Sequence, residues 1–348
     1  MERLMDVELP PASGRPIGDY ALLSDRHSAA LVARDGSVDW LCFPRFDSRS
    51  VCAALLDQRA GHWLVRPSGE AQVTRRYVPG TLVLETTFRT ASGTGILRDA
   101  LLLAPPRRSR LFSPRLASDH GHHLGKDAPH VLARSLECTA GELEVELEFL
   151  PRTEYGLTTP IVVGCAGGVR SRGGPDELVM SSPDLSLTHG DGFARGAAKL
   201  RAGASLAFAL QWHPAMTEPP STWSHQRISA ALSETIGAWQ RWDELHRGYD
   251  GPYAEQVALG SRVLKGLGYE PTGAIVAAAT TSLPEAIGGS RNWDYRFSWI
   301  RDASLTLQAM WVSACPHESG RFFSWAVNAA GAVAKGGTPI QIMYGIGG

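Results

Sequence analysis

The sequence has almost no net charge, few lysines and no long apolar run. Its 348 residues include 34 basic and 35 acidic side chains, for a formal net charge of −1, and this balance creates no field that would attract nucleic acid or an acidic membrane. Only four of the basic residues are lysines, and the arginines are dispersed among acids. No stretch of 18 apolar residues occurs, so we expect no transmembrane helix. These absences predict a small uncharged partner rather than nucleic acid or a membrane.

Clustered cysteines are missing as well. The five cysteines are scattered, at Cys42, Cys52, Cys138, Cys165 and Cys315. Their odd number and irregular spacing favour reduced thiols over disulfides or a zinc site. Residues 1–11 are acidic and lack the apolar segment of a secretory signal, which predicts a cytoplasmic protein.

Histidines gather in one place, at His120, His122, His123 and His130. The surrounding segment 105–129 is rich in Arg, Pro, Ser and Gly, a composition typical of a loop. A transition-metal site and a solvated loop both fit this cluster, and the loop is the simpler interpretation. We therefore predict no metal and no cofactor.

Short apolar stretches separated by Gly, Pro and Asp run from about residue 15 to residue 215, which predicts an antiparallel β-sandwich. The stretches are 29–32, 37–43, 61–65, 81–89, 95–102, 142–149, 161–163, 177–180 and 205–211. Within 142–149, four apolar residues alternate with four glutamates. This alternation indicates a strand with one buried face, whose glutamates are solvated rather than catalytic. Asp35-Gly36 predicts a hairpin between two of the strands.

Beyond residue 215 the apolar period becomes helical. The Pro-rich break at 218–222 precedes a helix predicted over 223–247, with Ser221 or Thr222 as its N-cap. Further helices are predicted over 253–267, 292–312 and 321–335, the last ending at Gly336. The 348 residues suggest about two domains. We expect a multi-domain protein, β then α: a tail at 1–14, the sandwich at 15–215, a linker and helix at 216–252, and helices at 253–348.

Residues 288–302 combine aromatic rings with paired charges. A helix that begins near Trp293 would place Tyr295, Trp299 and Asp302 on one face, with Arg301 beside Asp302. Rings offer flat surface to the C–H faces of a sugar, and a guanidinium next to a carboxylate can bind adjacent hydroxyls. An amphipathic helix with core aromatics and solvated ion pairs has the same spacing. The pattern alone leaves both interpretations open, although the chain reversal before it is a common place for a binding site.

Two segments resemble a known family. Residues 273–302, ending Arg-Asn-Trp-Asp-Tyr-Arg-Phe-Ser-Trp-Ile-Arg-Asp302, resemble glycoside hydrolase family 15, which contains glucoamylases, glucodextranases and a class of bacterial trehalases. Residues 16–25 and 29–48 resemble the trehalase-like N-terminal domain of bacterial members. One departure is the family-like Ser-Asp-Gly turn, which here is Ser24-Asp-Arg-His27. The resemblance implies that 253–348 holds the first helices of an incomplete (α/α)6 toroid.

The resemblance also implies roles for individual residues. Arg301 and Asp302 match a pair that binds hydroxyls of a glucose unit, and Tyr295 and Trp299 match aromatic residues around it. Arg291 to Asp294 match as well, with structural roles expected where the loop meets the helix. The loop 43–48 is expected to be a turn at the domain interface, with a place at the pocket mouth as the alternative.

Catalytic residues are not nominated. Inverting glycosidases need two carboxyl groups about 6.5–9.5 Å apart, and the resemblance places the general acid and base beyond residue 348. Glu285, Asp294 and Asp302 are therefore not assigned to catalysis, and this chain alone is expected to be inactive.

The leading functional hypothesis is inverting hydrolysis of α-glucosidic bonds, with trehalose as substrate. Glucoamylase or α-glucosidase activity on malto- or isomalto-oligosaccharides is the near alternative. A catalytically inactive carbohydrate-binding fragment and a phosphorylase remain as alternatives from other classes. The sequence predicts no oligomeric state.

Overall fold

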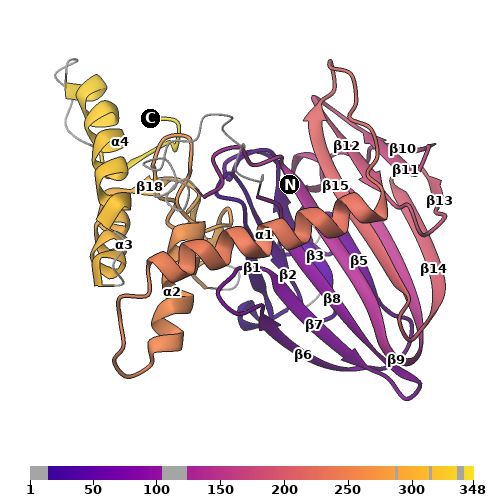
Figure 1. The fold of residues 1–348 in the computed structure, drawn as a ribbon. Helices are drawn as coiled ribbons and strands as arrows, with labels where there is room; N and C mark the ends of the chain where they lie inside the picture. The colour runs from indigo at the N-terminus through magenta and orange to yellow at the C-terminus, as the bar shows by residue number, and fades with distance from the viewer. Residues whose placement is uncertain (1–14, 104–123, 287–288, 313–315, 335–340) are drawn as a thin grey trace, which may run out of the picture.

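The computed structural model describes residues 15–103, 124–286, 289–312, 316–334 and 341–348. Figure 1 shows that the strands gather in one part of the molecule, that the long helix α1 crosses them, and that α2, α3 and α4 lie at one end. An antiparallel β domain followed by helices is therefore confirmed.

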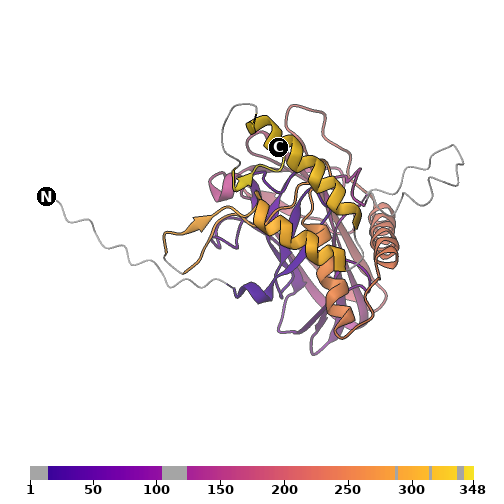
Figure 2. The ribbon, with the colours of Figure 1, turned by 90° about the vertical axis from the view of Figure 1, so that its left-hand side faces the viewer.

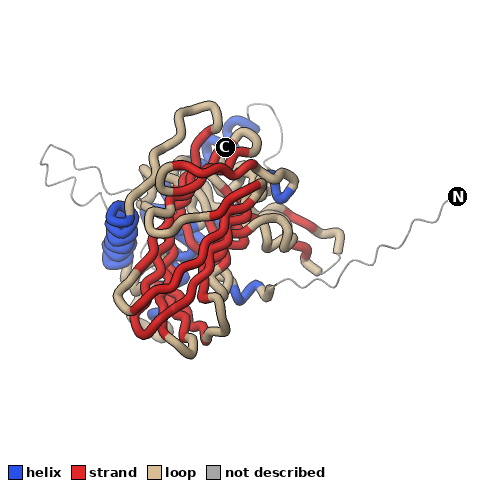
Figure 3. The backbone as a smooth tube through the Cα atoms, turned by 90° about the vertical axis from the view of Figure 1, so that its right-hand side faces the viewer, coloured by secondary structure: helices blue, strands red, loops and turns tan. Residues whose placement is uncertain are grey.

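The β domain contains two sheets that share β9 and so form one continuous network of 15 strands, in which every described pairing is antiparallel. One sheet contains β1 (Ala21–Ser24), β2 (Ala29–Val32), β3 (Ser37–Cys42), β4 (Ser50–Cys52), β5 (His62–Pro67), β13 (Thr188–Gly190) and β14 (Phe193–Arg201). The other contains β6 (Gln72–Tyr77), β7 (Leu84–Arg89), β8 (Gly93–Leu101), β10 (Ile161–Cys165), β11 (Gly168–Arg172), β12 (Asp176–Ser181) and β15 (Ser205–Pro214). Figure 3 shows their strands running side by side.

The strand β9 (Val131–Leu150) joins the two sheets. Its first half pairs with β8 and β15, and its second half pairs with β5 and β14. The predicted alternation is confirmed here: Leu143, Val145, Leu147 and Phe149 are each at most 2% exposed and lie in the core. On the other face the glutamates make ion pairs, for example Glu146 with Arg66 at 2.6 Å. They are solvated side chains, as expected.

The predicted Asp-Gly hairpin connects β2 and β3. Gly36 has a φ of +84°, and a Cβ atom there would lie 2.4 Å from the Val65 carbonyl oxygen. Only glycine meets both requirements without strain.

Within the β domain, the sequence located most strands but not all. Each predicted stretch contains or overlaps a strand. The prediction missed β1, β4, β6, β11, β13, β14 and the first half of β9. β6 packs little, because its residues alternate between exposed and half-buried, and β14 is rich in Gly and Ala, which are weak strand formers.

The helices are α1 (His225–Leu245), α2 (Ala254–Gly266), α3 (Ile300–Val312) and α4 (Pro316–Ala334), and two-residue ladders β16 (Leu283–Pro284), β17 (Asn292–Trp293), β18 (Ser298–Trp299) and β19 (Met343–Tyr344) lie among them. The α1 helix packs Ile228, Leu232, Trp239 and Trp242 against β-domain residues. Its predicted N-cap was wrong. Ser224 caps the helix by accepting a hydrogen bond from the Arg227 N–H, whereas Thr222 donates to the Ala166 carbonyl. Gly336 lies outside the described residues.

The Ser224→Ala substitution is expected to lower the free energy of unfolding by about 0.5–2 kcal/mol, because the Arg227 N–H loses its acceptor. Urea unfolding of the two proteins measures this difference. Ser233→Ala is the matched control, since the Ser233 hydroxyl bonds only the Ser229 carbonyl within the same helix. Equal midpoints for wild type and Ser224→Ala would contradict a capping role.

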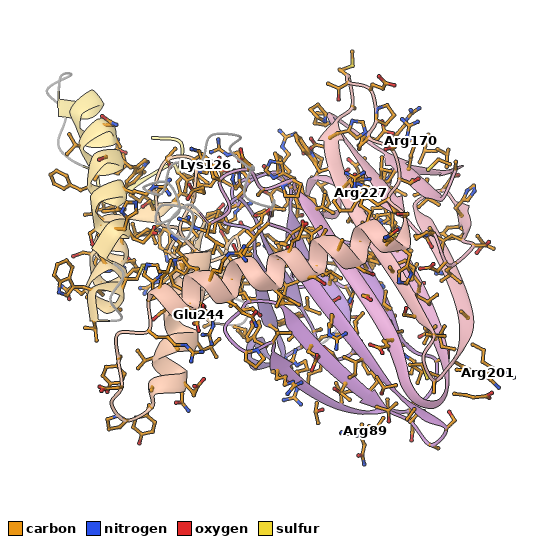
Figure 4. The ribbon with its side chains drawn as sticks, in the orientation of Figure 1. Arg89, Lys126, Arg170, Arg201, Arg227 and Glu244 are labelled. Atoms are coloured by element: carbon orange, nitrogen blue, oxygen red, sulfur yellow. The ribbon has the colours of Figure 1, made fainter. Side chains whose placement is uncertain are left out.

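Charged side chains are spread over the surface of the β domain. Figure 4 labels Arg89, Arg170 and Arg201, which come from three different strands and lie at separate places. The cysteines Cys42, Cys52, Cys138 and Cys165 are free thiols. Cys315 and the histidines His120, His122 and His123 lie outside the described residues. Among the described helices, none has the length and apolar character needed to cross a membrane.

Candidate functional site

The sequence predicted a helix from about Trp293 through the sugar-site candidates. This prediction was wrong, because the helix α3 begins only at Ile300. Asn292 and Trp293 form β17 and pair with Pro284 and Leu283 of β16. A turn follows, then β18 pairs with β19, and α3 begins only at Ile300. Figure 2 shows the β16–β17 hairpin projecting beside α3 and α4.

A side-chain hydrogen bond explains the late start of the helix. The Asp294 carboxylate accepts the Arg296 backbone N–H at 3.0 Å, which is an Asx-turn and competes with helical hydrogen bonding. The carbonyls of Tyr295 and Phe297 also accept bonds from the Ala278 and Ala277 N–H groups. The backbone of 294–297 is therefore held in an extended turn against segment 277–278.

Nevertheless, the structure brings the four candidates together. The Tyr295 and Trp299 rings lie 6.1 Å apart between centroids, tilted by 31°. The Arg301 guanidinium lies 5.8 Å from the Trp299 ring centroid and donates to the Asp302 carboxylate at 3.1 Å. The Trp299 Nε1 donor has no hydrogen-bond partner among the described residues. Two tilted rings with an adjacent ion pair can contact one face of a sugar and two of its hydroxyls.

This cluster is open to solvent. The Arg301 side chain is 73% exposed and the Asp302 side chain 35% exposed. The hollow of about 540 Å³ between β6 and α2 is lined by other residues, among them Tyr77 and Arg262. The site described by the structure is thus an open face at the start of α3.

Sequence reasoning missed Arg296, which ties this segment to the β domain. Its guanidinium donates to Asp294, to backbone carbonyls of the loop 43–48, and to the Tyr155 hydroxyl. The signal available in the sequence was the spacing Asp294-x-Arg296, which suits a local ion pair. The roles expected for Arg291 to Asp294 at the junction remain predictions, although Asp294 makes the turn described above.

The departure noted at Ser24-Asp-Arg-His27 also lies where β domain and helices meet. Arg26 has a φ of +68° and is fully buried. It pairs with Glu270 and, at 3.3 Å, with Glu318 of α4. Lys265 of α2 pairs with Glu318, and Arg321 of α4 pairs with Glu270. A buried network of this kind joins three parts of the chain.

The pKa of Glu318 makes this network sensitive to acid. Burial raises this pKa, but the charges of Arg26 and Lys265 lower it more, to about 2 from 4.5. A carboxyl whose pKa is lower in the folded state adds stability above pH 4.5 and loses it as the pH falls toward 2.

Glu318→Gln is therefore expected to destabilise the protein at pH 6 by about 3 kcal/mol relative to its effect at pH 2, because only the carboxylate gains from the two cations. Urea unfolding at both pH values measures the gap between variant and wild type. An unchanged gap at the two pH values would show that the carboxylate charge does not stabilise the fold.

Among the described residues, no group of three or more His, Cys, Asp or Glu side chains is placed to hold a metal ion. The buried glutamates are instead used in ion pairs with Arg and Lys.

Two family models match the chain. Residues 9–102 match the trehalase-like N-terminal family, and residues 251–348 match glycosyl hydrolases family 15. The C-terminal part of the chain is thus similar to glycosyl hydrolases family 15. The family 15 match contains all four sugar-site candidates, and the trehalase-like match contains Arg26 and the loop 43–48.

The relatives of this chain include trehalases. It is 36% identical over 345 residues to a trehalase of Mycolicibacterium smegmatis and 37% identical over 351 residues to a trehalase of Mycobacterium tuberculosis. Both alignments cover 96% of this chain but only 50% and 49% of the relatives. The chain therefore spans about half the length of these relatives.

A solved structure has a similar fold. The crystal structure of a bacterial glucoamylase complexed with acarbose matches with a TM-score of 0.59 at 10% identity, over 94% of this chain and 52% of that chain. At this identity the likeness concerns the fold alone.

Proposed function

We propose that this chain forms the sugar-binding part of an inverting glycoside hydrolase that acts on trehalose. The similarity to trehalases over 96% of the chain supports the substrate. The cluster of Tyr295, Trp299, Arg301 and Asp302 supports the site, because rings and a charged pair converge at the start of α3. That convergence is the observation that carries the proposal.

We propose that the acidic residues of this segment are neither the general acid nor the general base. A general acid must hold a proton near neutral pH. Burial raises the pKa of Asp294, but the hydrogen bonds from Arg296 lower it more, so this carboxyl is ionised. Glu285 accepts from the Trp293 indole at 3.1 Å and is nearly half exposed. Asp294 is therefore unsuited to the role of general acid, and its carboxylate is already bound by Arg296, which leaves sugar binding as the proposed role of this segment.

The helices are proposed to be the first of an (α/α)6 toroid, and the domains to divide at 15–215, 216–252 and 253–348. Large apolar side chains support this, since they remain exposed on α3 and α4: Leu305, Trp311, Val312, Phe323 and Val327, each more than 50% exposed. Apolar patches of this kind are normally covered. Further helices packed on α3 and α4 would cover them.

Isothermal titration with trehalose, maltose and isomaltose tests the proposal. Trehalose is expected to bind most tightly. Equal affinities for the three disaccharides would leave sugar recognition intact but reject trehalose as the preferred ligand. No heat with any of them, at concentrations up to about 100 mM, would reject sugar binding by this chain. Where glucose is released, the β-anomer seen by NMR identifies inversion.

A binding-only role is the second candidate. The exposure of Arg301 and Asp302 favours it, because an open site does not exclude water from a reaction. Trehalose binding without release of glucose would support this candidate.

A further inference from the structure

The side chain of Arg296 is buried and contacts residues of the β domain. It is 6% exposed. One terminal nitrogen donates to the Ser48 carbonyl at 2.8 Å and to the Phe46 carbonyl at 3.3 Å. The other donates to the Tyr155 hydroxyl at 2.9 Å. The guanidinium thus binds residues that precede it by more than 140 positions in the chain.

Aromatic rings of the β domain lie against the Arg296 guanidinium. The Arg296 guanidinium carbon lies 5.5 Å from the Tyr155 ring centroid and 6.0 Å from that of Trp40. Trp40 is fully buried in β3, and its indole donates to the Ala279 carbonyl at 3.0 Å. Segment 277–279, which bonds the backbone on both sides of Arg296, is therefore held by the same ring.

The charge of Arg296 is compensated within its own segment. Asp294 accepts from the Arg296 Nε at 3.0 Å and from a terminal nitrogen at 2.7 Å. A guanidinium is planar, and its donors are fixed in direction. Carbonyls, a hydroxyl and a carboxylate accept hydrogen bonds along these fixed directions. Few orientations of residues 294–296 therefore keep the buried guanidinium fully hydrogen-bonded.

Tyr295 is placed by this arrangement. It lies between Asp294 and Arg296, and its ring contacts Trp299. Any shift of the Arg296 anchor would move the adjacent Tyr295 backbone and change the distance between the two rings. Sugar contacts depend on that distance, since C–H groups must reach both rings together.

We propose that Arg296 is a positioning residue, through which the β domain sets the arrangement of Tyr295 and Trp299 for sugar binding. The inference rests on the proposed function for its ligand. It goes further because it gives the N-terminal β domain a part in sugar recognition. The loop 43–48 and Tyr155 bind Arg296 and thereby fix the conformation of the sugar-binding turn. The loop 43–48 contributes through its backbone carbonyls, which accept hydrogen bonds from Arg296.

Hydrogen–deuterium exchange and trehalose titration of the same variants test this inference. Arg296→Lys keeps the charge but cannot bind all the acceptors at once. We expect exchange in peptides covering 294–302 to rise about 10-fold, and the trehalose Kd to rise by about 10-fold, which corresponds to 1.4 kcal/mol. Tyr155→Phe removes one acceptor from the β-domain side and is expected to raise both by about 2- to 4-fold. Both are measured well below the melting temperature, so that only the folded protein is compared.

Arg291→Lys is the matched control, because this exposed arginine lies in the same segment and its one ion pair among the described residues is with Glu285, at 3.6 Å. It is expected to change neither quantity. Exchange in 294–302 within twofold of wild type in Arg296→Lys would overturn the positioning role. If exchange rises as expected but wild type binds none of the sugars, the anchoring stands and the proposed function fails. Raised exchange with an unchanged trehalose Kd would overturn the link to recognition.

Discussion

Replacing Arg301 by Met is expected to weaken trehalose binding by about 10- to 150-fold. A hydrogen bond that involves a charged group contributes about 1.5–3 kcal/mol, and Arg301 is the cation of the sugar-site cluster. Its loss also removes the partner that Asp302 holds at 3.1 Å. Isothermal titration of the wild type and the variant measures the ratio of the two dissociation constants.

Arg291→Met provides the comparison for this experiment. The two arginine side chains are similarly exposed, 76% for Arg291 and 73% for Arg301, and each pairs with one carboxylate. Removing Arg291 is expected to leave the affinity within about twofold of wild type. If both variants bind trehalose as well as wild type does, Arg301 does not contact the sugar. If both lose affinity equally, the effect comes from net charge.

Replacing Arg134 by Met is expected to lower the free energy of unfolding by about 3–5 kcal/mol. Arg134 and its partner Asp99 are both fully buried, with an Nε to Oδ1 distance of 2.8 Å. Burial raises the pKa of Asp99 even with this cation beside it. The variant would leave the Asp99 carboxyl without its counter-charge and would remove one donor each from the Trp63 and Gly36 carbonyls. Domains are typically stable by only about 5–15 kcal/mol, so the effect is large.

Urea unfolding measures this difference, and two further variants interpret it. Arg201→Met removes an arginine that is 84% exposed and pairs with Glu142 at 3.1 Å, and is expected to cost less than about 1 kcal/mol. Arg134→Met combined with Asp99→Leu is expected to recover part of the lost stability, because no unpaired charge remains. A cost for Arg134→Met no greater than that for Arg201→Met would show that the buried pair does not stabilise the fold.

The sequence predicted those elements whose side chains follow a clear period. The alternation at 142–149 and the Asp-Gly turn at 35–36 have local causes, and both predictions are confirmed. The first half of β9 was missed because Arg134 interrupts its apolar pattern. Its burial depends on Asp99, which lies 35 positions earlier. Pairing over such a distance leaves no periodic signal in the sequence.

At the candidate site, too, the sequence predicted some features and not others. The residue types around Arg301 and Asp302 were sufficient to select the segment, and the rings of Tyr295 and Trp299 do meet. The predicted helix over 292–299 was wrong because hydrogen bonds from other segments hold this stretch. Pairing with 283–284 and 343–344 decided the backbone there. Helical spacing cannot report on partners outside the helix.

The sharing of β9 between both sheets has a consequence for synthesis on the ribosome. β5 and β8 have no inner neighbour until residue 150 has been added, and the far side of β9 stays unpaired until β14 and β15 emerge. More than half of the chain must therefore leave the exit tunnel before either layer can close. During that interval exposed strand edges are open to wrong pairing, so a chaperone that binds unfolded chains would protect this protein most before β14 and β15 have emerged.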